Sequence, residues 1–125
     1  MNGKRLIETF MELVQIDSET KYEREICDKL IELFTSLGAQ VKEDDSAQRT
    51  GHGAGNLIIN LPASKGLEDL PAILFTCHMD TVVPGRGIKP RLDEDGYIRR
   101  DGSTILGSDD KAGIAAMIES IKILQ

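Results

Sequence analysis

The sequence predicts an α/β fold, and three observations carry this prediction. Apolar residues recur at helical spacing at both ends of the chain, over residues 4–14 and from about residue 111 onward. Between these ends, apolar runs such as residues 72–75 (AILF) have the length and composition of buried strands. His78 and Asp80 follow this run closely, and the carboxyl end of a strand is where open α/β sheets bind ligands. We therefore expect helices packed on a sheet, with a candidate site at a strand end.

Two helices are predicted in the first third of the chain. Residues 4–14 show the apolar periodicity of an amphipathic helix. The pattern Thr20-x-x-Glu23 fits a capping box that starts a second helix, and Gly38 is well placed to end it. The predicted buried stripe of this second helix consists of Ile26, Leu30, Leu33, Phe34 and Leu37.

The sequence of the middle of the chain predicts strands joined by loops. Residues 39–43 predict an edge strand and residues 56–61 a second strand. The polar, glycine-rich residues 44–55 between them predict a loop, in which His52 would be exposed, without a carboxylate beside it and outside the site. Residues 72–77 predict the central strand that delivers the histidine motif.

The last third predicts a hairpin and a helix. Residues 93–96 (DEDG) form a hairpin-type turn between two short strand segments. From about residue 111 the chain is expected to be helical, with one apolar face.

Composition and charge narrow the classes of partner. Acidic residues outnumber basic residues by 21 to 15, the net charge is -6, and no basic cluster marks a phosphate-binding face. We therefore expect no nucleic-acid partner. Neither a membrane span of about 18 apolar residues nor a signal peptide is recognisable, and the two cysteines predict reduced thiols rather than a disulfide framework. These features predict a cytoplasmic protein.

Two motifs carry the candidate chemistry. In a strand-like segment His78 and Asp80 point the same way, so that the carboxylate can orient an imidazole that binds a metal. Asp109 and Asp110 lie in a glycine-flanked turn, and with His78 they would form a mixed nitrogen and oxygen site. Zn²⁺ is favoured for such a set, and Co²⁺ or Mn²⁺ would also serve. From the residues alone, a loop-capping histidine and an aspartate-rich helix N-terminus remain open as structural interpretations.

Residues 77–85 (CHMDTVVPG) and 101–113 (DGSTILGSDDKAG) together resemble the paired signature of the co-catalytic di-zinc exopeptidases. This family includes carboxypeptidase G, aminoacylase, succinyl-diaminopimelate desuccinylase and peptidase T. The second motif is most similar to the peptidase T (tripeptide aminopeptidase) branch. The resemblance covers essentially the whole chain, but only about the first third of such an enzyme.

The resemblance implies a fold, a domain arrangement and residue roles. The fold would be the N-terminal part of a zinc-peptidase α/β/α domain, a mostly parallel sheet between helices, truncated in a final helix that carries no stop signal. Residues 1–125 would be the N-terminal part of the catalytic domain, without the lid or dimerisation domain and the second half of the catalytic domain. His78 would bind one zinc ion, Asp109 would bridge two, and Asp80 would assist catalysis by orienting His78. The peptide bond after Asp109 would be cis.

The resemblance further implies a di-zinc exopeptidase that hydrolyses short peptides, releases the N-terminal residue of tripeptides and forms a homodimer at full length. This chain alone would lack the general-base glutamate and the remaining ligands, so we expect it to be inactive and to self-associate. A related deacylase, dipeptidase or carboxypeptidase is an alternative. Other classes are a non-catalytic metal-binding domain and a Mg²⁺-dependent phosphotransfer protein, with Lys111 near the phosphate.

Overall fold

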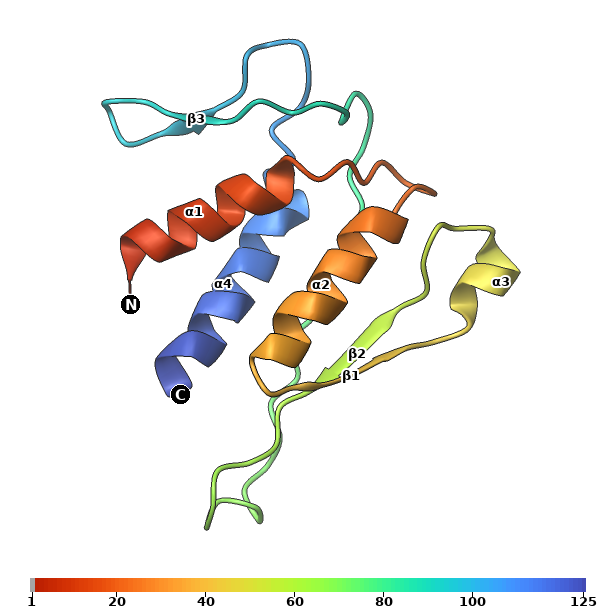
Figure 1. Cartoon of the computed structure of the whole chain (residues 1–125), viewed down its shortest axis with the longest axis vertical. Coiled ribbons are helices and arrows are strands. Elements are labelled where there is room, and N and C mark those ends of the chain that lie inside the picture. The colour runs from red at the N-terminus through yellow and green to blue at the C-terminus, as the bar shows by residue number, and fades with distance from the viewer. Residues whose placement is uncertain (1) are drawn as a thin grey trace.

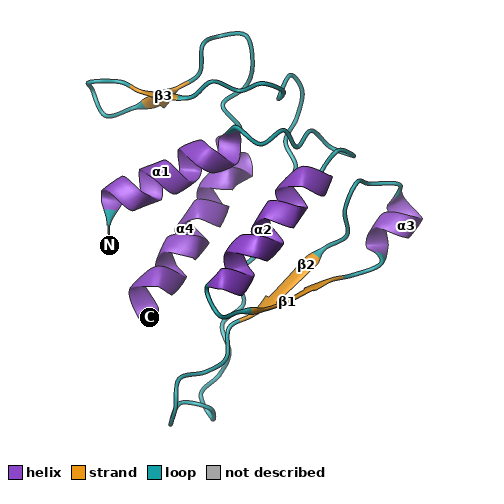
Figure 2. Cartoon of the chain, in the orientation of Figure 1, coloured by secondary structure: helices purple, strands orange, loops and turns teal. Residues whose placement is uncertain are grey.

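Helices and two small antiparallel sheets form the computed structural model, which describes residues 2–125 (Figure 1). The helices are α1 (Gly3–Val14), α2 (Arg24–Ser36), the short α3 (Ser46–Thr50) and α4 (Ser108–Leu124). The strands are β1 (Gln40–Glu43), β2 (Leu57–Asn60), β3 (Arg91–Leu92) and β4 (Ile98–Arg99). β1 pairs with β2 and β3 with β4, both antiparallel. The helices and strands are joined by long loops (Figure 2).

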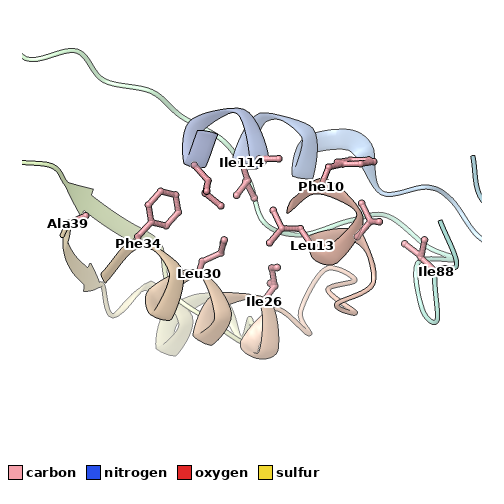
Figure 3. Packing of buried hydrophobic residues seen from close by; sticks show 11 residues of the cluster. Phe10, Leu13, Ile26, Leu30, Phe34, Ala39, Ile88 and Ile114 are labelled. Carbon is pink, nitrogen blue, oxygen red and sulfur yellow. The ribbon is translucent and has the colours of Figure 1, made fainter. Parts of the chain in front are cut away.

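The core lies where the apolar faces of α1, α2 and α4 meet (Figure 3). Leu13 of α1 and Ile26 of α2 are fully buried, and Ile114 and Ile118 of α4 complete the cluster. Helical spacing brings these residues to one face of each helix. The predicted stripe of α2 is buried at Ile26, Leu30 and Phe34, whereas Leu33 and Leu37 are partly buried. The two long predicted helices at the ends of the chain are thus confirmed, as is α2.

Several predicted boundaries are also confirmed. Gly38 has a φ of +79°, a left-handed conformation that favours glycine, and it follows the C-cap residue of α2, Leu37, at the turn into β1. The edge strand, the second strand and the hairpin appear as β1, β2 and the β3–β4 pair. The predicted loop at residues 44–55 contains one element that the sequence analysis missed, the short helix α3.

The predicted central strand at residues 72–77 is wrong for this chain. The structure describes all six residues and assigns them to no strand, and Ile73, Leu74 and Phe75 are 78%, 86% and 69% exposed. A strand requires a hydrogen-bonded neighbour, and the two sheets within residues 2–125 are each limited to two strands. The mostly parallel sheet is therefore absent from the described residues, where the parallel pairing found is an isolated bridge between Glu19 and Thr81.

The predicted capping box before α2 is also wrong. The Glu23 side chain makes no capping bond to the helix. Its buried carboxylate instead accepts hydrogen bonds from the backbone N–H groups of Lys21 and Gly53, at 2.6 and 2.9 Å, and lies 3.0 Å from Nδ1 of His52. The threonine of the pattern, Thr20, uses its hydroxyl elsewhere, as described below. The expectation that His52 has no neighbouring carboxylate is corrected by the same contacts.

A partly buried ion pair joins α1 to α4. Arg5 donates from Nε and Nη2 to the two carboxylate oxygens of Glu119, at 2.7 and 3.0 Å, and the backbone N–H of Asn2 donates to the same carboxylate at 2.8 Å. These donors, the Arg5 side chain first, lower the pKa of Glu119 to about 2.

Within residues 2–125, no helix has the length and hydropathy needed to cross a membrane.

We expect the Arg5–Glu119 pair to make stability depend on pH in acid. Because the folded-state pKa of Glu119 is depressed from 4.5 to about 2, the stabilisation is complete above the unfolded value and is lost as the pH falls through that window. Glu119→Gln should therefore lower the melting temperature at pH 6, and the difference from wild type should shrink between pH 4.5 and pH 2. Thermal unfolding followed by circular dichroism measures this difference in melting temperature, with Glu94→Gln on the exposed hairpin turn as control. A constant difference across this range would contradict the assignment.

Candidate functional site

The structure brings His78, Asp80 and Asp109 together, although Asp109 is 31 residues from His78 in the chain. Nδ1 of His78 lies 3.1 Å from Oδ1 of Asp80 and 3.0 Å from the Asp80 carbonyl oxygen. Nε2 of His78 lies 2.9 Å from Oδ1 of Asp109. The imidazole is thus flanked by one carboxylate at each ring nitrogen.

These contacts constrain the protons on the ring. Nδ1 faces only oxygen acceptors of Asp80, so this nitrogen carries a hydrogen and donates it. In the neutral ring, Nε2 then presents a lone pair toward Asp109, which presents another. Two converging lone pairs need a proton or a shared cation between them. The arrangement is the one in which a carboxylate orients a metal-binding histidine.

Electrostatics agree with this geometry. Burial disfavours the charged imidazole, but hydrogen bonding to Asp109 and to the Asp80 carbonyl outweighs it, and the pKa of His78 is raised above its ordinary value. The pKa of Asp80 is lowered, first by the hydrogen bond from the Thr20 hydroxyl and then, against burial, by His78. Asp80 is therefore held as the carboxylate that an Nδ1–H donor needs.

The three residues border a hollow of about 250 Å³. Its other walls come from the segment after Asp80 and from the turn that leads into α4, residues Thr81, Val82, Ile105, Leu106, Gly107 and Ser108. The Asp109 side chain is 93% exposed, and that of His78 is half-exposed. Asp109 and Asp110 have non-helical backbone angles within α4, and the peptide bond between them is cis, which confirms the expectation drawn from the resemblance.

Gly113 allows α4 to approach the histidine motif closely. A Cβ atom at this position would lie 2.5 Å from Oδ1 of Asp110 and 2.8 Å from the sulfur of Cys77. Any side chain would force these groups apart. Desolvation, and then hydrogen bonding to Asp110, raise the pKa of the Cys77 thiol to about 11. Cys77 therefore remains a thiol at neutral pH.

The atoms of His78 and Asp109 are of the types that bind zinc, but two residues are fewer than the ligands that a catalytic zinc ion needs. His78 and Asp109 supply one nitrogen and one carboxylate, which are donors that zinc accepts. A catalytic zinc ion generally has about three protein ligands. Within residues 2–125, no group of three or more His, Cys, Asp or Glu side chains is gathered as a metal site requires.

Thr20 and Lys111 have supporting roles that the sequence did not predict. The Thr20 hydroxyl donates to Oδ2 of Asp80 at 2.7 Å, across 60 residues of sequence. Lys111 is fully buried and donates from Nζ to the carbonyl oxygen of Ile16 at 2.6 Å. No sequence pattern signals contacts over such separations, because they depend on how the loop that precedes α2 packs against the site.

Comparison with known proteins identifies relatives over the whole chain. No family model matches it. It is 61% identical over 125 residues to the uncharacterized protein YqjE of Bacillus subtilis, covering all of this chain and 33% of that protein. It is 30% identical over 156 residues to peptidase T of Aliivibrio salmonicida, covering 98% of this chain and 38% of that protein.

Solved structures show the same backbone. The crystal structure of the aminopeptidase PepT from Bacillus cereus matches with a TM-score of 0.95 and 60% identity, over 99% of this chain and 32% of that one. A tripeptidase from Staphylococcus aureus matches with a TM-score of 0.94 and 48% identity, over the same shares of the two chains. The chain thus spans about a third of the length of these relatives. In sequence and in backbone, it corresponds to about one third of a peptidase T (tripeptidase) chain.

Proposed function

We propose that residues 1–125 are the N-terminal part of the catalytic domain of a longer zinc-dependent exopeptidase. The longer protein would act in the cytoplasm as a homodimer and release the N-terminal residue of tripeptides. The observation that carries the proposal is the contact of His78 with Asp80 at one ring nitrogen and with Asp109 at the other. Relatives named peptidase T and tripeptidase support the substrate class.

Each of the three residues has a role that follows from its contacts. Asp80 accepts the Nδ1 hydrogen of His78 and so leaves Nε2 free to bind a metal. Asp109 is exposed enough for both carboxylate oxygens to be used, as a bridge between two ions requires. When bound, two zinc ions, or Co²⁺ or Mn²⁺ in their place, would polarise the scissile carbonyl and lower the pKa of the attacking water. The general base and the remaining ligands would lie beyond residue 125.

The position of Lys111 disfavours the phosphotransfer alternative. That alternative needs an ammonium group facing a phosphate in the site. Lys111 is instead completely buried, with Nζ hydrogen-bonded to the carbonyl oxygen of Ile16. Its cationic head is therefore committed to the protein interior.

Metal removal from the longer protein tests the proposed function. The protein, dialysed against a chelator and then freed of it, should lose cleavage of an unblocked tripeptide and regain it on addition of Zn²⁺. An N-acetylated tripeptide and a dipeptide should remain poor substrates throughout, because the proposal is an aminopeptidase rather than a deacylase or a dipeptidase. Cleavage that survives chelation, or a preference for the acetylated peptide, would contradict the proposal.

A further inference from the structure

The loop that precedes α2 is fixed along the histidine motif by backbone hydrogen bonds. Thr81 donates its N–H to the carbonyl oxygen of Ser18 at 2.9 Å, and Thr20 donates its N–H to the carbonyl oxygen of Thr81 at 3.0 Å. Ser18 and Thr81 are both buried. This parallel bridge sets the position of residue 20 relative to Asp80 without involving any side chain.

Side chains of the same loop strengthen this attachment. The Glu19 carboxylate accepts from the N–H of Gly85 and from Nε of Arg86, both at 2.8 Å, and Asp17 accepts from the N–H of Gly87 at 2.8 Å. The Arg86 guanidinium also lies over the ring of Tyr22, 4.6 Å from its centroid. Residues 17–22 are therefore a fixed support for the segment that carries Asp80, rather than a free connection between helices.

Thr20 is the member of this support that reaches the site. Its hydroxyl donates to Oδ2 of Asp80 at 2.7 Å, and its second acceptor among residues 2–125, the Thr81 carbonyl oxygen, is at 3.4 Å. Since a hydroxyl has one hydrogen to donate, the shorter contact is the effective one. Oδ1 of Asp80 is engaged by Nδ1 of His78. Both carboxylate oxygens thus have a partner, and the plane of the carboxylate is fixed.

The other half of the site is attached to the same loop. Lys111, two residues after Asp109, donates to the carbonyl oxygen of Ile16 at 2.6 Å. Residues 16–20 therefore hold the start of α4 at one end and Asp80 at the other. This one short segment therefore contributes to the relative position of Nε2 of His78 and Oδ1 of Asp109.

We propose that Thr20 is a positioning residue, which holds the Asp80 carboxylate so that the His78 ring directs Nε2 toward Asp109. The inference rests on the proposed function, because it assigns Thr20 to the metal-binding ability of His78. Removal of the hydroxyl leaves Oδ2 without its donor and lets the carboxylate rotate. The expected loss is that of a partner outside the metal ligands, about 10-fold in zinc affinity.

The test compares variants of the longer protein. Thr20→Val keeps the branched shape of the side chain and removes its hydroxyl, whereas Thr20→Ser keeps the hydroxyl and removes the methyl group. Thr50→Val is the matched control, since its hydroxyl also donates a hydrogen bond, to the Ser46 carbonyl oxygen in α3, away from the site. Zinc affinity is measured by equilibrium competition with a chelator, and tripeptide cleavage is measured alongside. Thr20→Val should lose about 10-fold in zinc affinity, whereas Thr20→Ser and Thr50→Val should match wild type.

A double-mutant cycle separates positioning from a general structural effect. If Thr20 acts through Asp80, then Thr20→Val should add no further loss of zinc affinity in the Asp80→Ala background. An equal loss in both backgrounds, or wild-type affinity for Thr20→Val alone, would overturn the inference. If Asp80→Ala itself binds zinc normally, then the proposed function fails, and this outcome is distinct from a failure confined to Thr20.

Discussion

Asp109→Ala should abolish peptide cleavage by the longer protein and lower the number of zinc ions that it binds. The Asp109 carboxylate lies 2.9 Å from Nε2 of His78, and no comparable group within residues 2–125 completes a set of three ligands. Removal of a bridging carboxylate would leave two cations facing each other with no negative charge between them. At a separation of about 4 Å their repulsion is large even in a medium more polar than a protein interior. Zinc content by atomic absorption and tripeptide turnover are the measurements.

Two further variants make this result interpretable. Asp80→Ala should be milder, with a loss of about 10- to 100-fold, because Asp80 acts through His78 rather than on the metal. Asp69→Ala, on the exposed loop before residue 72, should have no effect. Normal zinc content in Asp109→Ala, or a loss in Asp69→Ala of the same size, would show that the carboxylate at position 109 has no special role.

The isolated 125-residue chain should show no metal-dependent hydrolysis. It supplies two donors where a catalytic zinc ion has about three, so its zinc affinity should be poor. The proposed function also places the general base outside residues 1–125, and such a group typically contributes about 10²–10⁴-fold. Assay of tripeptide cleavage with excess Zn²⁺ or Co²⁺, against the longer protein as positive control, measures the difference. Turnover by the isolated chain would place the catalytic residues within residues 1–125 and contradict the division of roles.

The same chain should self-associate. Ile73, Leu74 and Phe75 are consecutive, apolar and mostly exposed, and they have no strand partner among the described residues. Such a segment offers both apolar surface and unpaired backbone groups to a second copy. Light scattering should therefore give a mass above 13.7 kDa, and Leu74→Lys should lower it. A monomer at all concentrations would contradict this expectation.

The sequence predicted the helices well because helix formation depends on neighbouring residues. The 3.6-residue period determines which faces of α1, α2 and α4 are apolar. The end of α2 is also a local feature, because it depends on the positive φ angle of Gly38, a residue next to the helix in the chain. The β3–β4 hairpin was predicted for the same reason, because its two strands are joined by a short turn. The failed prediction at residues 72–77 concerned a strand, whose existence depends on a neighbour that can lie anywhere in the sequence.

The same distinction between local and long-range contacts applies to the candidate site. His78 and Asp80 are two residues apart, so strand-like geometry was enough to predict their contact. The proximity of Asp109 to His78 was predicted from the donor types of the two motifs and from their resemblance to a known family, because no rule of local backbone geometry links residues 31 positions apart. The roles of Thr20 and Glu23 were mistaken because the capping pattern was assumed to act within its own helix. Thr20 instead contacts Asp80 of the site, and Glu23 contacts His52 and Gly53 in the loop after α3.

Zinc-edge anomalous diffraction from crystals of the longer protein, grown with Zn²⁺, would locate the metal relative to His78 and Asp109. We expect an anomalous peak about 2.0–2.2 Å from Nε2 of His78 and from one oxygen of Asp109. A second peak is expected beside the other Asp109 oxygen, about 3.5–4 Å from the first. Zinc bound elsewhere, with His78 and Asp109 still paired directly to each other, would contradict these expectations.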